Sequence, residues 1–129
     1  MIAGRFILVC VGGAIGTAAR YLTALWVPSI LGSSFPFATL LINTVGSFLI
    51  AFIMHIGSSS EMLSPDLRAM LTTGVMGGFT TYSTFNYETT EFLREGAWPL
   101  AAANVLGTVA ICLAAGFAGV AAARMIVGR

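Results

Sequence analysis

A stretch of 19 residues, from Ala69 to Tyr87, contains no Asp, Glu, Lys or Arg. An apolar run of this length is sufficient to cross a lipid bilayer as a helix. Its centre nevertheless contains three glycines, Gly74, Gly77 and Gly78, followed by hydroxyl side chains and spaced aromatic rings. Non-helical backbone at membrane depth is tolerated only where protein buries it or where it lines a cavity. The stretch therefore predicts a membrane span that is interrupted near its middle.

The glycines in this run admit two interpretations. Gly74 and Gly78 have the spacing of the small-residue faces through which membrane helices pack closely. Alternatively, the interruption is a built site, because donors and aromatic rings follow the glycines directly. The hydroxyl cluster consists of Thr80, Thr81, Ser83 and Thr84. The combination favours a site over packing alone.

Composition extends the membrane prediction to the whole chain. Of its 129 residues, 57% are hydrophobic and 9% are charged, whereas soluble domains contain about 25% charged residues. The net charge of +1 and the lack of a basic stripe argue against nucleic-acid binding. Cys10 and Cys112 lie in apolar runs without CxxC or Cys/His spacing, so we interpret them as small hydrophobic residues.

Four spans are predicted, at about residues 5–27, 37–56, 67–92 and 98–127, within one all-α membrane domain over residues 1–129. We expect Pro28 to end the first span, Ser64 to cap the third, and Pro65 to occupy its first helical position. The first span has a cleavable signal peptide as its alternative, although Thr17-Ala18-Ala19 is a poor cleavage site. The loops are too short for a catalytic domain, so the chain is not expected to be an enzyme.

The arginines predict an orientation. Four of them flank one membrane face, which would place both termini in the cytoplasm. They are Arg5, Arg68, Arg124 and Arg129, against Arg94, and Arg20 if it snorkels, on the other face. Small-residue faces in several spans further predict an oligomer.

Polar side chains recur at helical spacing inside three spans. Within lipid, such groups usually face a bundle interior or a water-filled path. The stripes are Thr39, Asn43 and Ser47; Thr80 and Thr84; and Asn104, Thr108 and Cys112. Interhelical hydrogen bonds would explain any one stripe, but three stripes in so short a chain predict a polar path.

The chemistry of the path favours an anion. No carboxylate lies near a span centre, and Glu88 is expected near a membrane surface. Donors remain at depth, namely the Asn43 and Asn104 amides, the hydroxyl groups, free backbone N–H groups and the positive edges of aromatic rings. This array suits a small, strongly hydrated anion. Arg20 either draws anions into a mouth of the path or snorkels to headgroups.

The segments GGAIGTAARY (12–21), TLLINTVGSFLIAF (39–52) and GVMGGFTTYSTFNYET (74–89) closely resemble the Fluc/CrcB family of fluoride channels. The resemblance follows the whole chain in order. It implies a multi-pass protein of a bacterial or archaeal plasma membrane that forms an antiparallel, dual-topology homodimer. Two pores along the subunit interface would let cytoplasmic fluoride leave passively while chloride is excluded.

The resemblance also implies which residues line the pore and its vestibules. Asn43 corresponds to an anion-coordinating amide, and Tyr82 and Phe85 to two rings whose edges face the ion, with Tyr82 replacing a phenylalanine of relatives. The expected pore set is Asn43, Tyr82, Phe85, Thr39, Ser83, Thr84, Asn104, Thr108 and Cys112. Asn104 and Cys112 depart from the polar track of relatives. Arg20 and Glu88 correspond to vestibule residues.

A structural sodium ion at the dimer centre is implied as well. Backbone carbonyls matching Gly77 and Thr80, two from each subunit, would bind it, and oxygen ligands suit such a hard cation. A symmetric site of this kind requires inverted partners. The motif therefore outweighs the arginine count, which favours a single orientation.

Two alternatives belong to other classes. A small dual-topology multidrug exporter has a similar length and span count but depends on a membrane-embedded Glu in its first span, where this chain has only Arg20. A non-transporting assembly subunit would explain the glycines but not the donor-rich stripes.

Overall fold

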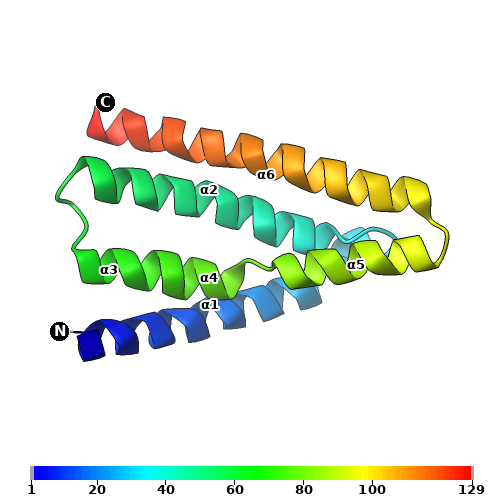
Figure 1. Ribbon diagram of the computed structural model, residues 1–129, viewed down its shortest axis with the longest axis horizontal. Coiled ribbons are helices and arrows are strands. Elements are labelled where there is room, and N and C mark those ends of the chain that lie inside the picture. The colour runs from blue at the N-terminus through cyan, green and yellow to red at the C-terminus, as the bar shows by residue number, and fades with distance from the viewer. Residues whose placement is uncertain (1, 129) are drawn as a thin grey trace.

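The computed structural model describes residues 2–128, which form an all-helical bundle (Figure 1). The elements are α1 (Ile2–Leu31), α2 (Phe37–Ser59), α3 (Pro65–Ala69), the π-helix η1 (Met70–Met76), α4 (Gly77–Phe79), α5 (Tyr82–Arg94) and α6 (Trp98–Val127). The all-α prediction is confirmed for these residues. Arg129, which the orientation argument counted, lies outside the described residues.

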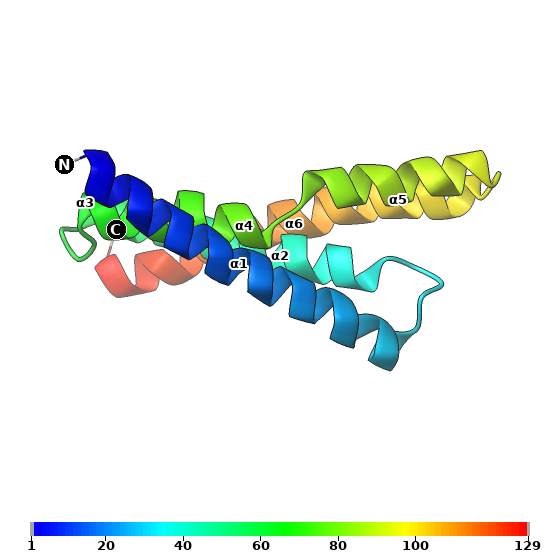
Figure 2. The ribbon, with the colours of Figure 1, turned by 90° about the horizontal axis from the view of Figure 1, so that it is seen from below.

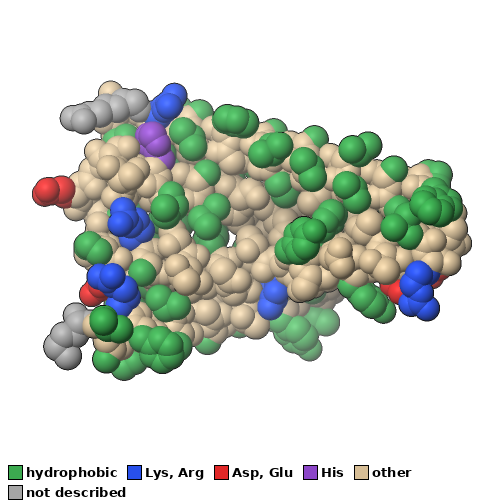
Figure 3. Space-filling model, in the orientation of Figure 1, with side chains coloured by type: hydrophobic (Ala, Val, Ile, Leu, Met, Phe, Trp, Pro, Cys, Tyr) green, Lys and Arg blue, Asp and Glu red, His purple; other side chains and the backbone are tan. Residues whose placement is uncertain are grey.

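Three helices, α1, α2 and α6, are long and apolar enough to cross a membrane by length and composition. The remaining elements, α3, η1, α4 and α5, follow one another in the place of the expected third span (Figure 1). The start of α1 and the end of α6 lie at the same end of the bundle (Figure 1). Charged side chains gather mainly at the two ends, with apolar surface between them (Figure 3).

Pro28 does not end the first helix, so that expectation is wrong. Helix α1 continues through Pro28 to Leu31. A proline in the last turn removes a single backbone donor, which the end of a long helix tolerates more easily than its middle. The helix ends at Gly32, which has a φ of +80° and donates its amide to the Pro28 carbonyl at 2.9 Å. Glycine adopts this left-handed conformation without steric cost.

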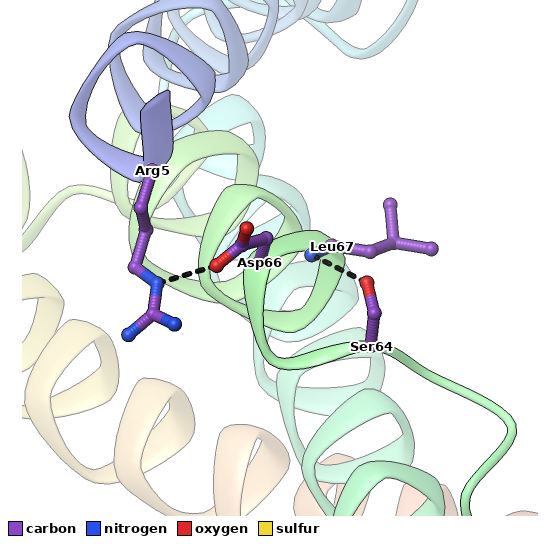
Figure 4. A network of polar contacts seen from close by, with 4 residues as sticks. All are labelled: Arg5, Ser64, Asp66 and Leu67. Atoms are coloured by element: carbon purple, nitrogen blue, oxygen red, sulfur yellow. Dashed lines mark hydrogen bonds and ion pairs between the residues drawn. The ribbon is translucent and has the colours of Figure 1, made fainter. Parts of the chain in front are cut away.

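Ser64 caps α3, as the sequence predicted. Its Oγ accepts a hydrogen bond from the Leu67 amide at 3.2 Å, and Pro65 occupies the start of the helix (Figure 4). In the same turn, Asp66 accepts from Arg5 Nε of α1 at 2.7 Å (Figure 4). Both side chains are about half exposed, so in water this ion pair would add little stability. It fixes the start of α1 beside the start of α3.

The third span is interrupted, as predicted, but the interruption is more elaborate than a single kink. The backbone first widens into the π-helix η1, which replaces the middle of a regular helix. After the short α4, Thr80 and Thr81 adopt extended conformations, with ψ angles of 157° and 109°. Helix α5 then begins at Tyr82. We refer to Thr80 and Thr81 as the break (Figure 1).

Glycines join α1 to the elements before the break. A Cβ atom on Gly12 would lie 2.6 Å from the Met70 carbonyl oxygen, and one on Gly74 would lie 2.8 Å from that of Val9. A Cβ on Gly16 would clash with the Val75 carbonyl. The packing interpretation of the glycines is therefore correct, and it coexists with the break. Figure 2 shows α1 alongside α3 and α4 and diverging from α5.

Candidate functional site

Asn43 of α2 pairs with the backbone of the break. Its Nδ2 donates to the Thr81 carbonyl at 3.0 Å, and its Oδ1 accepts from the Thr81 amide at 2.8 Å. The carboxamide thus replaces the peptide group that a neighbouring helical turn would supply. Both backbone groups of Thr81 are satisfied, which an apolar environment demands. One of the two Nδ2 hydrogens of Asn43 remains for another acceptor.

Thr81 also organises the start of α5. Its hydroxyl oxygen accepts from the Thr84 amide at 3.2 Å, as an N-cap does, and its hydroxyl lies 2.9 Å from Thr84 Oγ1 and 3.3 Å from Ser83 Oγ. Only 5% of the residue is exposed. Thr81 was absent from the expected pore set. A threonine before the first residue of a helical pattern is an N-cap signal, and that signal would have identified it.

A surface groove lies beside the break, where α2, α5 and α6 meet it; we call it the central groove. Its polar and aromatic lining residues are Asn43, Ser47, Thr80, Tyr82, Phe85, Thr108 and Cys112. The Tyr82 and Phe85 rings lie side by side, with centroids 5.7 Å apart and planes inclined by 50°. Among the described residues, no carboxylate or basic side chain lines the groove. The fold therefore brings together part of the expected pore set, from segments far apart in the sequence.

A second groove lies toward the far end of α5, against the loop between α1 and α2; we call it the end groove. It includes Thr39, Thr84 and Glu88. Thr39 is buried and donates its hydroxyl to Glu88 Oε1 at 2.7 Å. The other carboxylate oxygen, Oε2, is buried without a hydrogen-bond partner among residues 2–128. Thr39 and Thr84 thus line the end groove together with Glu88, and neither lines the central groove that contains the ring pair.

Asn104 lies between helices and not on either groove. It is 1% exposed, and its Nδ2 donates to Thr89 Oγ1 of α5 at 2.9 Å. Thr108 donates to Asn104 Oδ1 at 3.5 Å, one turn further along α6. Cys112 continues this face to the central groove, where its sulfur lies 3.9 Å from Thr44 Oγ1. Asn104 therefore joins α5 to α6, while Thr108 and Cys112 face the groove.

Arg20 reaches inward to the break. Its Nη1 donates to the Thr80 carbonyl at 3.4 Å, and the side chain is part-buried. The contact directs the side chain toward the break. Glu88, the other expected vestibule residue, lines the end groove.

The backbone at the break fits a cation bound by carbonyl oxygens. In an unbroken α-helix the Thr81 amide would reach the Gly77 carbonyl, but here it donates to Asn43. Gly77 is exposed, and Thr80 presents its carbonyl to Arg20. Carbonyl oxygens of this kind suit sodium, a hard cation. Among residues 2–128, no group of His, Cys, Asp or Glu side chains is arranged to hold a metal instead.

Fold and site together define a multi-pass helical membrane protein with a polar groove beside a broken helix. The sequence matches the family described as CrcB-like protein, Camphor Resistance (CrcB), over residues 7–120, and the chain belongs to this family. Its relatives include a protein of Anaeromyxobacter dehalogenans (strain 2CP-1) that is 52% identical over 96% of this chain and 98% of its own length. A relative from Sorangium cellulosum is 45% identical over 95% and 97% of the two chains. One from Geobacter sulfurreducens is 46% identical over 92% and 95%. All three are named fluoride-specific ion channel FluC.

Proposed function

We propose that this chain forms a fluoride-selective channel through which cytoplasmic fluoride leaves the cell passively. The names of its relatives support this activity. The observation that carries the proposal for this chain is the pairing of Asn43 with Thr81, which holds a donor-rich break beside a groove without carboxylates. In a bacterial inner membrane such a channel would relieve fluoride toxicity.

The central groove offers what a fluoride ion needs when it leaves water. Fluoride is small and strongly hydrated, so it crosses only where other hydrogen-bond donors replace its water. The second Nδ2 hydrogen of Asn43 supplies such a donor, and the edges of Tyr82 and Phe85 carry partial positive charge. The N-terminus of α5 also faces this region, where a helix favours negative charge. No lining carboxylate repels the ion.

A second, inverted copy of the chain would complete the pathway. In one chain the central groove opens to the surface, Tyr82 is 77% exposed, and Gly77 is exposed although it lies at the middle of a span. An antiparallel partner would cover these groups and give two equivalent pores. It would also bring a second pair of Gly77 and Thr80 carbonyls to the dimer centre. A sodium ion held there would neutralise four carbonyl dipoles that the break leaves without helical donors.

Reconstituted protein tests the proposal directly. Proteoliposomes loaded with potassium fluoride should release fluoride to an external electrode when valinomycin compensates the charge. Matched vesicles loaded with potassium chloride should release essentially no chloride. Equal release of both anions, or no release, would contradict the proposed function.

The same assay separates the alternatives. A multidrug exporter would require a proton gradient and a cationic substrate, and α1 carries Arg5 and Arg20 but no carboxylate. A non-transporting assembly subunit would leave the vesicles sealed to both anions. Polar groups converging on one groove favour the channel over either alternative.

A further inference from the structure

Arg20 places a positive charge against the break without a carboxylate to balance it. Its Nη1 lies 3.4 Å from the Thr80 carbonyl oxygen, although the two residues are 60 positions apart. Among residues 2–128, the ion pairs are those of Arg5 and Arg94, and neither includes Arg20. A backbone carbonyl is therefore the only hydrogen-bond acceptor that the described chain offers to this guanidinium.

The same carbonyl is one of the two proposed sodium ligands. A carbonyl oxygen has two lone pairs, so its geometry allows two partners. Two cations that contact one oxygen nevertheless repel each other at close range. Part burial weakens the screening by solvent and salt that would make such repulsion small at an exposed site.

We infer that Arg20 competes with sodium for the Thr80 carbonyl oxygen and lowers the sodium affinity of the break. The inference rests on the proposed sodium site. It holds that Arg20 of α1, which does not coordinate the ion, lowers the affinity of that site for sodium. Sodium binding then weakens the contact between Arg20 and Thr80, and removing the arginine charge strengthens sodium binding.

Sodium-dependent thermal unfolding of the purified full-length protein measures this affinity without relying on conduction. Sodium chloride replaces N-methyl-D-glucamine chloride at constant ionic strength, and the midpoint of the rise in melting temperature reports the affinity. The neutral variants Arg20→Met and Arg20→Gln should lower the midpoint by about tenfold, the order expected for loss of one nearby charge in a medium of intermediate dielectric constant. Arg20→Lys keeps the charge and should stay much closer to the wild type.

Arg94→Met is the matched control. Arg94 is an exposed arginine in the last turn of α5, paired with Glu91 rather than with the break. Its removal changes the net charge by the same amount and should leave the sodium midpoint unchanged. An equal shift in this variant would show that net charge, and not the Arg20 contact, governs the midpoint, and would overturn the inference.

A measurement on the wild-type protein covers the case in which the neutral variants do not fold. The chain contains six arginines and no lysine, and phenylglyoxal modifies arginines at rates that peptide mass spectrometry can assign to each position. Sodium should increase modification at Arg20 and leave Arg94 unchanged. Unchanged or reduced reactivity at Arg20, or a raised midpoint in a folded neutral variant, would show that the arginine does not compete with sodium.

If wild-type protein shows no sodium response in either assay, the inference fails together with the sodium site. Fluoride efflux measured on the same preparation then reports separately on the channel. Retained efflux would support the proposed transport function without the sodium site, whereas loss of efflux would contradict both the transport function and the sodium site.

Discussion

At the scale of the residue, Asn43 supports the backbone of the break as well as lining the central groove. Its carboxamide supplies both a donor and an acceptor to Thr81, at 3.0 Å and 2.8 Å, and so replaces backbone hydrogen bonds that the break removes. A hydrogen bond left unmade in a buried site costs more than the bond contributes when formed. A single amide therefore supports the backbone, and in the proposed channel its remaining N–H would be available to an ion.

Asn43→Asp should impair fluoride efflux by at least about tenfold. The carboxylate keeps the acceptor for the Thr81 amide but loses the donor to the Thr81 carbonyl, and it places negative charge where an anion must pass. Initial efflux rates at equal protein density measure the effect. Asn86→Asp, on the exposed face of α5, makes the same chemical change away from both grooves. If the Asn43→Asp variant retained the wild-type efflux rate, the Asn43 amide would not contribute to fluoride passage.

Tyr82→Phe should retain efflux within about twofold of the wild type. The centroid of the Tyr82 ring lies 5.7 Å from that of Phe85, and Tyr82 is 77% exposed. Phenylalanine preserves the positive ring edge. The same electrode assay gives the comparison, with Tyr82→Ala as the variant that deletes the ring and should be impaired. Complete loss in Tyr82→Phe would show that the phenol itself contacts the ion or the partner chain.

At the scale of the element, the third span depends on α1 for its position. The backbones of α1 and η1 approach so closely that side chains would collide at Gly12, Gly16 and Gly74. Because no hydrophobic effect drives helices together within lipid, such close van der Waals packing is a main source of association. The same close packing of α1 against η1 places Arg20, one turn beyond Gly16, against the break.

Gly16→Ala should destabilise the folded protein by about 1–3 kcal/mol, the usual cost of forcing extra volume into packed structure. The added methyl group would meet the Val75 carbonyl and the Phe79 amide, which are backbone atoms that move only with their whole segment. Thermal unfolding in detergent measures the change. Gly4→Ala, in the same helix with nothing within 4 Å of its added Cβ, should melt like the wild type. Equal melting temperatures for both variants would contradict the close packing of α1 against η1.

At the scale of the whole molecule, a single chain leaves polar and apolar surfaces uncovered. The central groove is open, and exposed apolar side chains extend over α1 and α6. Lipid would cover ordinary apolar surface, but it offers no partner to the polar groups of the groove or to the carbonyl of an exposed mid-span glycine. In the proposed dimer, an inverted second chain would supply such partners.

Cysteine labelling of each end tests dual orientation in cells. In a Cys10→Ala, Cys112→Ala background, Gly4→Cys and Gly128→Cys mark the two ends of the chain, which lie at one end of the bundle (Figure 1). A membrane-impermeant maleimide should label comparable fractions of each from outside, because an antiparallel dimer would place half of the subunits in each orientation. Labelling from one side only would refute the antiparallel dimer and support the orientation that the arginine count favours.

The sequence by itself determined the features that arise from adjacent residues. Hydropathy and low charge specified helices suited to a membrane, the glycines and hydroxyls after Met76 located the break, and Ser64-Pro65 located a helix start. Each depends on local chemistry, namely chain length in lipid, backbone freedom and capping. Pro28 was misjudged because its effect depends on its distance from the end of the helix rather than on the residue itself.

Only the tertiary structure decided which of the polar residues meet. Asn43 and Thr81 are 38 positions apart, and Arg20 and Thr80 are 60 apart. Their contacts depend on the rotation and crossing of separate helices, which a stripe of polar residues does not specify. The same rotation buries Asn104 between α5 and α6 while it turns Thr108 and Cys112 toward the groove. Helical spacing predicts which residues share a face of a helix, but only the packing of the helices determines which residues that face contacts.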